Sequence, residues 1–187
     1  MVLCSQTKWY ILGGIYAVRR LSSQTHHGQG ITYNEKSIVG FSAEQMFQVV
    51  YNIENYPLFV PWCKKAVVHK KNDGVLEAEL FVGFPPLKEH YKSRVTTIYP
   101  TVIRSVCTDG RLFNSFDTVW RFGEHPPNYP QQSCLLHFTL DFEFKSVLYA
   151  HLANLVFGQV AKTMVSAFLK RAEFMYGPPS MLPVKIP

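Results

Sequence analysis

The apolar and polar positions of this chain follow two periods, and the change from one to the other marks where a β-rich middle gives way to a helix. Between residues 134 and 144 apolar and polar side chains alternate strictly, which is typical of a strand with one buried face. Between residues 148 and 175 apolar residues recur every three or four positions, as in an amphipathic helix about 42 Å long at ~1.5 Å per residue. Gly177 and two prolines then end the helix.

Shorter alternating segments precede this strand, and turn signals such as Asn72-Asp73-Gly74 separate them. We expect strands at residues 31–39, 66–71, 75–82, 87–99, 102–108 and 116–122, with a further turn at Asp109-Gly110. An early helix is expected to begin at Ser42, because its side chain can cap free backbone N–H groups and Gln45 holds the capping-box position. Pro57 and Pro61 are expected to end helical structure.

The element order is one strand, one helix, several antiparallel strands and one long helix. This order predicts an α+β fold in which a curved antiparallel sheet wraps the C-terminal helix and leaves a hydrophobic tunnel between them. A length of 187 residues suits one domain. We place that domain at residues 31–180, after a polar linker at residues 22–30 and before a tail at residues 181–187.

Composition supports a packed core and offers little catalytic chemistry. Hydrophobic residues make up 47% and aromatics 14% of the chain, which argues against global disorder. The four cysteines form no C-x-x-C pair, so we expect reduced thiols, with neither disulfide nor zinc. The sequence contains no P-loop, no G-x-S-x-G and no H-x-x-x-H motif, and we expect no metal or cofactor.

The first 34 residues contain no acidic side chain, since Glu35 is the first. The apolar run at residues 9–18 is shorter than the ~20 residues that span a bilayer, and Arg19-Arg20 follow it. We therefore predict that residues 1–21 are a mitochondrial presequence, removed after Leu21. N-terminal sequencing of the organelle form should begin at or near Ser22, and an intact N-terminal methionine would contradict this prediction.

Aromatic and apolar side chains at strand ends, in turns and on the long helix are the candidate ligand contacts. Trp62, Trp120 and Phe138 are expected to form the wall of the tunnel, and Phe84 and Phe113 its rim, because turns seldom hold apolar side chains. The other candidates, on the turn before the strands and on the long helix, are Phe59, Leu155 and Met164. The alternative interpretation is that most of these residues belong to an ordinary core.

Basic side chains cluster on neighbouring β segments, at Lys64, Lys65, Lys88 and Lys92. Either they form a solvated sheet face or they dock the protein on an anionic membrane. The whole chain has a formal charge of +6, and the remainder has +3 once the three basic residues of the expected presequence are set aside. Cys63 stands beside Lys64, and we interpret it as a structural thiol.

Four segments carry a family resemblance: residues 56–65 (YPLFVPWCKK), 83–86 (GFPP), 107–114 (CTDGRLFN) and 176–178 (YGP). Over residues 31–180 they resemble the mitochondrial coenzyme Q-binding protein family. The resemblance implies a START-like, polyketide-cyclase-type helix-grip fold, ubiquinone as bound ligand, and a peripheral place on the matrix side of the mitochondrial inner membrane. It also implies a carrier or chaperone, not an enzyme, that supports respiration and ubiquinone synthesis alongside the complexes of those processes.

Physical reasoning agrees with a carrier, because burying each CH₂ of an isoprenoid tail gains roughly 0.8 kcal/mol without any catalytic group. The same fold also hosts aromatase/cyclases, so an enzyme acting on a polyketide or a quinone precursor is the alternative. Such an enzyme needs acid/base groups converging in the tunnel, whereas the inward candidates are mainly apolar. A ribosome-associated toxin of this fold is a third interpretation. We expect no nucleic-acid partner, because the basic face lacks the interleaved aromatics of a stacking surface.

Overall fold

A computed structural model of the chain describes residues 30–84, 87–110 and 113–186, with side chains for all of these except 84, 87, 110 and 147–160. The expected presequence and nearly all of the expected linker lie outside the described residues. Within them, the elements in chain order are β1 (Ile31–Val39), α1 (Ala43–Tyr51), the 3₁₀ helix η1 (Ile53–Leu58), β2 (Cys63–Asn72), β3 (Val75–Phe84), β4 (Leu87–Ile98), β5 (Val102–Gly110), β6 (Phe113–Gly123), β7 (Cys134–Phe144), α2 (Val147–Tyr176) and β8 (Val184–Ile186).

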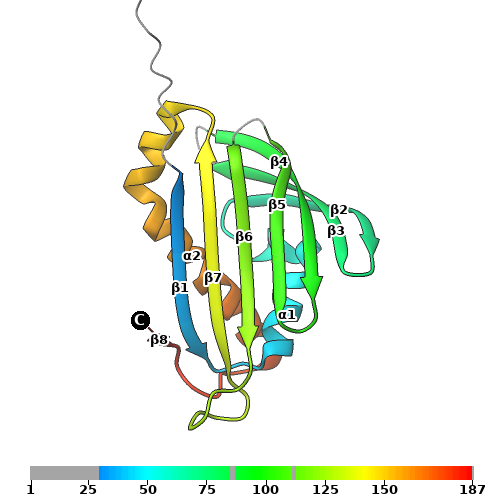
Figure 1. The fold of residues 1–187 in the computed structure, drawn as a ribbon, viewed down its shortest axis with the longest axis vertical. Helices are drawn as coiled ribbons and strands as arrows, with labels where there is room; N and C mark the ends of the chain where they lie inside the picture. The colour runs from blue at the N-terminus through cyan, green and yellow to red at the C-terminus, as the bar shows by residue number, and fades with distance from the viewer. Residues whose placement is uncertain (1–29, 85–86, 111–112, 187) are drawn as a thin grey trace, which may run out of the picture.

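All eight strands form a single antiparallel sheet in the order β2-β3-β4-β5-β6-β7-β1-β8. The sheet curls, and α2 crosses its inner face diagonally, behind β1, β7 and β6 in the view of Figure 1. The shorter helix α1 lies on the same side of the sheet, near one end of β5 and β6 (Figure 1). This arrangement confirms the expected α+β fold with a curved sheet gripping a long C-terminal helix.

The helix α1 begins as the capping box predicts. The backbone N–H of Gln45 donates to Ser42 Oγ at 3.3 Å, and the Ser42 N–H donates to Gln45 Oε1 at 2.9 Å. Its apolar side chains then turn inward, with Met46 and Val50 buried. Helical structure does not stop at the first proline, because η1 continues through Pro57 to Leu58. A 3₁₀ turn accommodates Pro57 because its ring fixes a φ that the helix already has.

The expected turn at Asp109-Gly110 is wrong, and the expected C-terminal tail holds an additional strand. Asp109 and Gly110 do not form a turn: they pair with Lys92 and Tyr91 of β4, and β5 runs through both of them. The expected tail contains β8, which pairs with β1 and extends the sheet by one strand. Both segments gain backbone hydrogen bonds along a neighbouring strand, and such edge pairing has no strong signal in a short sequence.

The inner face of the sheet and the facing side of α2 form the core. Alternate residues of β7 are buried, as the strict alternation predicts, and the buried residues of α2 follow helical spacing. These buried residues are Leu136, Phe138, Leu140 and Phe142 on β7, and Ala161, Val165, Phe168 and Ala172 on α2. The core therefore lies between the sheet, α1 and the described side chains of α2, and a cavity remains within it.

Candidate functional site: an apolar cavity beneath the long helix

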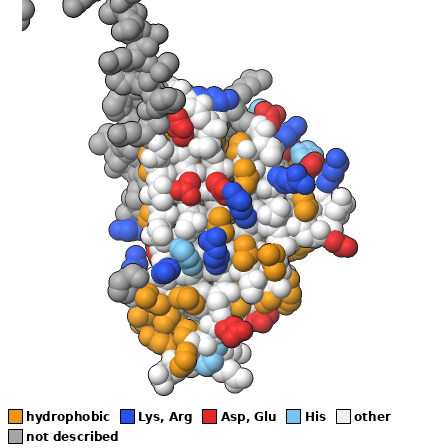
Figure 2. All heavy atoms as spheres, in the orientation of Figure 1, with side chains coloured by type: hydrophobic (Ala, Val, Ile, Leu, Met, Phe, Trp, Pro, Cys, Tyr) orange, Lys and Arg blue, Asp and Glu red, His pale blue; other side chains and the backbone are white. Residues whose placement is uncertain are grey.

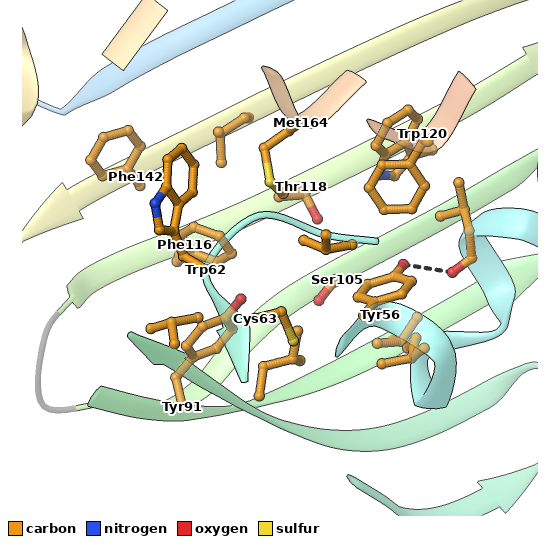
Figure 3. A pocket seen from close by; sticks show the side chains of 18 of the residues that line it. Tyr56, Trp62, Cys63, Tyr91, Ser105, Phe116, Thr118, Trp120, Phe142 and Met164 are labelled. Atoms are coloured by element: carbon orange, nitrogen blue, oxygen red, sulfur yellow. Dashed lines mark hydrogen bonds between the residues drawn. The ribbon is translucent and has the colours of Figure 1, made fainter. Parts of the chain in front are cut away.

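An internal cavity of about 300 Å³ lies between the inner face of the sheet, the segment from η1 to β2, and α2 (Figure 3). Its walls are almost entirely apolar and include side chains from α1, η1, the six strands β2 to β7 and the described part of α2. The lining residues that the sequence did not single out include Val50, Ile53, Val60, Leu80, Val82, Val95, Ile103, Phe116, Leu140, Phe142 and Phe168. The arrangement offers a dry compartment for an apolar molecule.

One end of the cavity is closed by three aromatic side chains from three elements. The Trp120 ring of β6 lies 4.2 Å from Phe138 of β7 and 4.8 Å from Phe168 of α2, measured between centroids. Trp120 is only 5% exposed, and both phenylalanines are buried as well. Their contact holds α2 against the sheet. The same three rings therefore serve both as part of the packed core and as one wall of the cavity.

Trp62 reaches the cavity from the segment that joins η1 to β2 (Figure 3). Its backbone has φ 62°, in the left-handed region that a bulky residue seldom adopts. The N–H of Gly83 on β3 donates to the Trp62 carbonyl oxygen at 2.9 Å and holds the strand start in place. An unusual backbone conformation that is held by its neighbours is common where a side chain is positioned for a ligand.

The other end of the cavity is a cluster of half-buried aromatic rings around Phe113. Its ring lies 4.8 Å from Phe116, 5.1 Å from Phe144 and 5.9 Å from Tyr91, between centroids. The expectation that Phe113 stands in a turn is wrong, because β6 begins at this residue. Phe113 does line the cavity, as part of a packed aromatic wall.

Four hydroxyl groups interrupt the apolar lining. The Tyr56 hydroxyl donates to the backbone carbonyl of Val50 at 2.6 Å and is therefore occupied. Tyr91 of β4, Ser105 of β5 and Thr118 of β6 also line the cavity, and Ser105 and Thr118 are direct partners across the two strands. Within the described part of the chain, no hydrogen bond engages these last three hydroxyls, so they can donate to a ligand.

The titratable groups of the lining are weak acids that burial keeps protonated. Burial raises the pKa of the Tyr56 and Tyr91 hydroxyls well above the ordinary value, and neighbouring charges, including that of Cys63, add to the effect. Burial also raises the pKa of the Cys63 thiol, which opposes formation of a reactive thiolate. Among the described lining residues there is no carboxylate, histidine or lysine. The polar groups therefore act at neutral pH as hydrogen-bond donors.

The cavity brings together five of the eight side chains that the sequence proposed for ligand contact, namely Trp62, Phe113, Trp120, Phe138 and Met164. Phe59 is not among the lining residues: its ring packs against Phe168 at 5.1 Å and faces a separate surface groove. The side chains of Phe84 and Leu155 lie outside the described residues. The three free hydroxyls were not predicted from the sequence, although Ser105 and Thr118 point to the same face of their strands as Ile103 and Trp120 do.

The four lysines proposed for membrane docking are exposed on β2 and β4. The strands β2, β3 and β4 also carry acidic side chains and histidines, including Glu79, Glu89 and His90, and the face drawn in Figure 2 mixes Lys and Arg with acidic side chains and histidines. Lys92 stands opposite Glu79 in the backbone register of β3 and β4. The Lys65 Nζ atom lies 5.3 Å from the centre of the Phe81 ring. Docking through Lys64, Lys65, Lys88 and Lys92 stays a prediction.

The described residues contain no cluster of three or more His, Cys, Asp or Glu side chains that could hold a metal ion. None of the helices in this part of the chain is both long and apolar enough to cross a membrane.

One family model and several proteins of known name match the sequence of this chain. A family model described as polyketide cyclase/dehydrase and lipid transport matches residues 39–169. The mitochondrial coenzyme Q-binding protein COQ10 homolog B of Xenopus laevis is 47% identical over 147 residues, which are 79% of this chain and 60% of that protein. The mitochondrial coenzyme Q-binding protein COQ10 of Drosophila melanogaster is 39% identical over 173 residues, covering 87% of this chain and 71% of the relative. The ribosome association toxin RatA of Escherichia coli is 30% identical, covering 75% and 85%.

Solved structures share the fold at low sequence identity. The Zhui aromatase/cyclase of Streptomyces sp. R1128 superimposes with a TM-score of 0.66 at 16% identity, covering 78% of this chain and 94% of that one. A START superfamily protein from Mycobacterium smegmatis gives 0.65 at 21% identity, covering 79% and 99%. These likenesses confirm the helix-grip fold, and the choice of ligand rests on the cavity and on the closer relatives.

Proposed function

The chain belongs to the polyketide cyclase/dehydrase and lipid transport family and, within it, to the mitochondrial coenzyme Q-binding proteins, and from that premise we propose that it binds ubiquinone in the cavity beneath α2. The observation that carries the proposal is the apolar lining, in which the hydroxyls of Tyr91, Ser105 and Thr118 have no hydrogen-bond partner within the described residues. Because the chain matches 60% of the Xenopus relative's length, the ligand and role of that relative enter here as a proposal for this chain.

The chemistry of the cavity suits a substituted quinone with an isoprenoid tail. Quinone carbonyl and methoxy oxygens accept hydrogen bonds, and Tyr91, Ser105 and Thr118 can donate them from three adjacent strands. The surrounding aromatic and aliphatic wall suits the tail, because each buried CH₂ contributes roughly 0.8 kcal/mol. A volume of about 300 Å³ is at the low end of the ~300–1,000 Å³ usual for ligand cavities. The cavity therefore fits the ring and the first part of the tail.

The role that follows is carriage of ubiquinone without chemical change. A carrier shelters the ring and proximal tail from water, releases the ligand unchanged and needs no catalytic group. We propose that the protein works peripherally at the matrix side of the mitochondrial inner membrane, where it delivers ubiquinone to the respiratory chain and supports its synthesis. The mitochondrial names of the relatives support the organelle.

The test is to purify the protein under mild conditions, extract it with organic solvent and identify the released lipids by mass spectrometry. Ubiquinone should be recovered at a substantial fraction of one molecule per chain. Recovery of no quinone, or of a different lipid class that is not displaced by added ubiquinone, would overturn the proposal.

Removing the free hydroxyls should weaken quinone binding without harming the fold. Each neutral hydrogen bond contributes about 0.5–1.5 kcal/mol, so Tyr91→Phe, Ser105→Ala and Thr118→Val should each raise the quinone Kd about 2- to 10-fold. Thermal unfolding should change little, because no protein group loses a partner. Fluorescence titration with a short-chain ubiquinone checks the result. Unchanged Kd in all three variants would place the quinone ring elsewhere.

A cyclase acting on a polyketide or a quinone precursor is the second candidate, favoured by the structural likeness to the Streptomyces aromatase/cyclase. Such an enzyme needs a base to take a proton from carbon and an acid to return one to oxygen. The described lining supplies tyrosine, serine, threonine and cysteine groups, and burial raises the pKa of Tyr56, Tyr91 and Cys63, which opposes their use as bases. Turnover of a quinone precursor by the purified protein would establish this alternative.

A further inference from the structure

A second depression in the described surface lies on the outer side of α2, where this helix meets the segment that follows η1. It is lined on one side by Leu58, Phe59 and Pro61, and on the other by residues of α2 at helical spacing: Lys162, Thr163, Ser166, Ala167, Lys170, Arg171 and Phe174. Pro61 lines the internal cavity as well, so one short loop separates the two spaces. We refer to this depression as the α2 groove.

Two large apolar side chains stand exposed at the α2 groove. Leu58 is 70% exposed and Phe174 is 80% exposed. Single exposed apolar side chains are common on protein surfaces, but these two flank one groove from opposite sides. They are suited to enter an apolar phase next to the protein.

The α2 groove is also lined by basic side chains. Lys162 and Lys170 are exposed and lie eight residues apart on α2, so they stand on one face of the helix. Neither forms an ion pair in the described part of the chain. The nearby acidic residues Glu54 and Glu173 are exposed, and neither lines the groove.

Arg171 is the third cation of the groove, and one of its N–H groups lacks a hydrogen-bond acceptor among the described residues. Its guanidinium carbon lies 5.6 Å from the centre of the Phe59 ring and 5.1 Å from that of Phe174. The Nε atom is buried and has no hydrogen-bond partner in the described structure. A buried N–H without an acceptor costs free energy, and the guanidinium group of Arg171 can donate hydrogen bonds to an anionic oxygen that enters the groove.

We propose that the α2 groove is the surface through which the protein docks on a bilayer of anionic phospholipid, with a phosphate group among Lys162, Lys170 and Arg171 and with Leu58 and Phe174 inserted beside it. Cations interleaved with exposed apolar side chains match the boundary between charged headgroups and acyl chains. The inference deepens the proposed function, since a carrier docked here would hold its cavity one loop away from the membrane that supplies the quinone.

The α2 groove differs from the lysines of β2 and β4 in its chemistry. Among the described side chains of β2 and of the first half of β4, no large hydrophobic is strongly exposed, and acidic residues stand among the lysines. A face of mixed charge gains less from an anionic surface than a purely cationic groove does. The two sites therefore make opposite predictions for charge-reversal variants.

The experiment compares vesicle binding by the full chain and two matched double variants. Co-sedimentation should be measured with vesicles of phosphatidylcholine alone and of phosphatidylcholine with cardiolipin. The wild-type protein should prefer the cardiolipin vesicles and should lose binding as salt is raised. Lys162→Glu with Lys170→Glu should weaken binding at least about tenfold, since each basic side chain near the surface contributes about fivefold. Lys64→Glu with Lys65→Glu changes the net charge equally and should have a smaller effect.

A second arm tests the apolar contact. Leu58→Ser with Phe174→Ser should weaken binding to cardiolipin vesicles at every salt concentration, while thermal unfolding stays near that of the wild type because both side chains are exposed. Stronger loss in the Lys64/Lys65 variant than in the Lys162/Lys170 variant, equal loss in both, or equal binding to the two vesicle types would overturn the inference. Lipid extraction of the same proteins reads out quinone content separately, so failure of docking is distinguishable from failure of quinone binding.

Discussion

Replacing Trp120 with alanine is expected to remove bound quinone and to lower the free energy of unfolding by about 3–5 kcal/mol, the usual cost of truncating a large buried aromatic. The indole is 5% exposed and packs against Phe138 and Phe168, so it joins β6, β7 and α2. Its loss both enlarges the cavity and loosens the grip of the sheet on α2. A domain of this size has about 5–15 kcal/mol in total, so the variant should still fold at low temperature.

A matched variant separates the two effects. Phe47 is also a buried aromatic, 3% exposed, and packs against Phe122 and Tyr51, but it does not line the cavity. Phe47→Ala should lose a similar free energy of unfolding yet retain its quinone when both variants are purified well below their unfolding temperatures. Equal quinone content in the two variants would show that Trp120 serves the core alone.

Filling the cavity should abolish quinone binding with little cost to the fold. Ser105 points into the cavity from the middle of β5, opposite Thr118 of β6. A benzene-sized ring needs on the order of 150 Å³, so the ring of Ser105→Phe would take about half of the 300 Å³ available. The quinone recovered by extraction should fall at least about tenfold, whereas the free energy of unfolding should change by less than about 2 kcal/mol, because the added ring enters empty space.

Ser105→Ala is the control for this variant, because it removes the hydroxyl without adding volume. It should retain quinone at reduced affinity. If Ser105→Phe carries as much quinone as the wild type while its unfolding remains cooperative, the ligand does not occupy this cavity, and the carrier proposal would need another site.

The sequence was sufficient for elements whose signal is local. The strict alternation from Leu136 to Phe142 predicts which face of β7 is buried, because neighbouring side chains of a strand point to opposite faces. The spacing of Phe168 and Ala172 likewise predicts the buried side of α2, and Ser42 with Gln45 predicts the start of α1. These local patterns, read in order along the chain, were enough to predict a curved antiparallel sheet around a long C-terminal helix and to propose Trp62, Trp120 and Met164 as ligand contacts.

Tertiary structure decided every feature that depends on contacts between distant residues. Phe59 lies outside the cavity because its ring packs against Phe168, a residue more than 100 positions later in the chain, and it is Phe168 that lines the cavity. Ser105 and Thr118 stand side by side because of the register between β5 and β6, and Tyr91 joins the same lining from β4, which no single segment encodes. The α2 groove joins Leu58 to Lys162, Lys170 and Arg171 only when η1 packs on the helix. Local periodicity determines which way a side chain faces within its element, whereas the neighbours it meets depend on packing between elements across the whole chain.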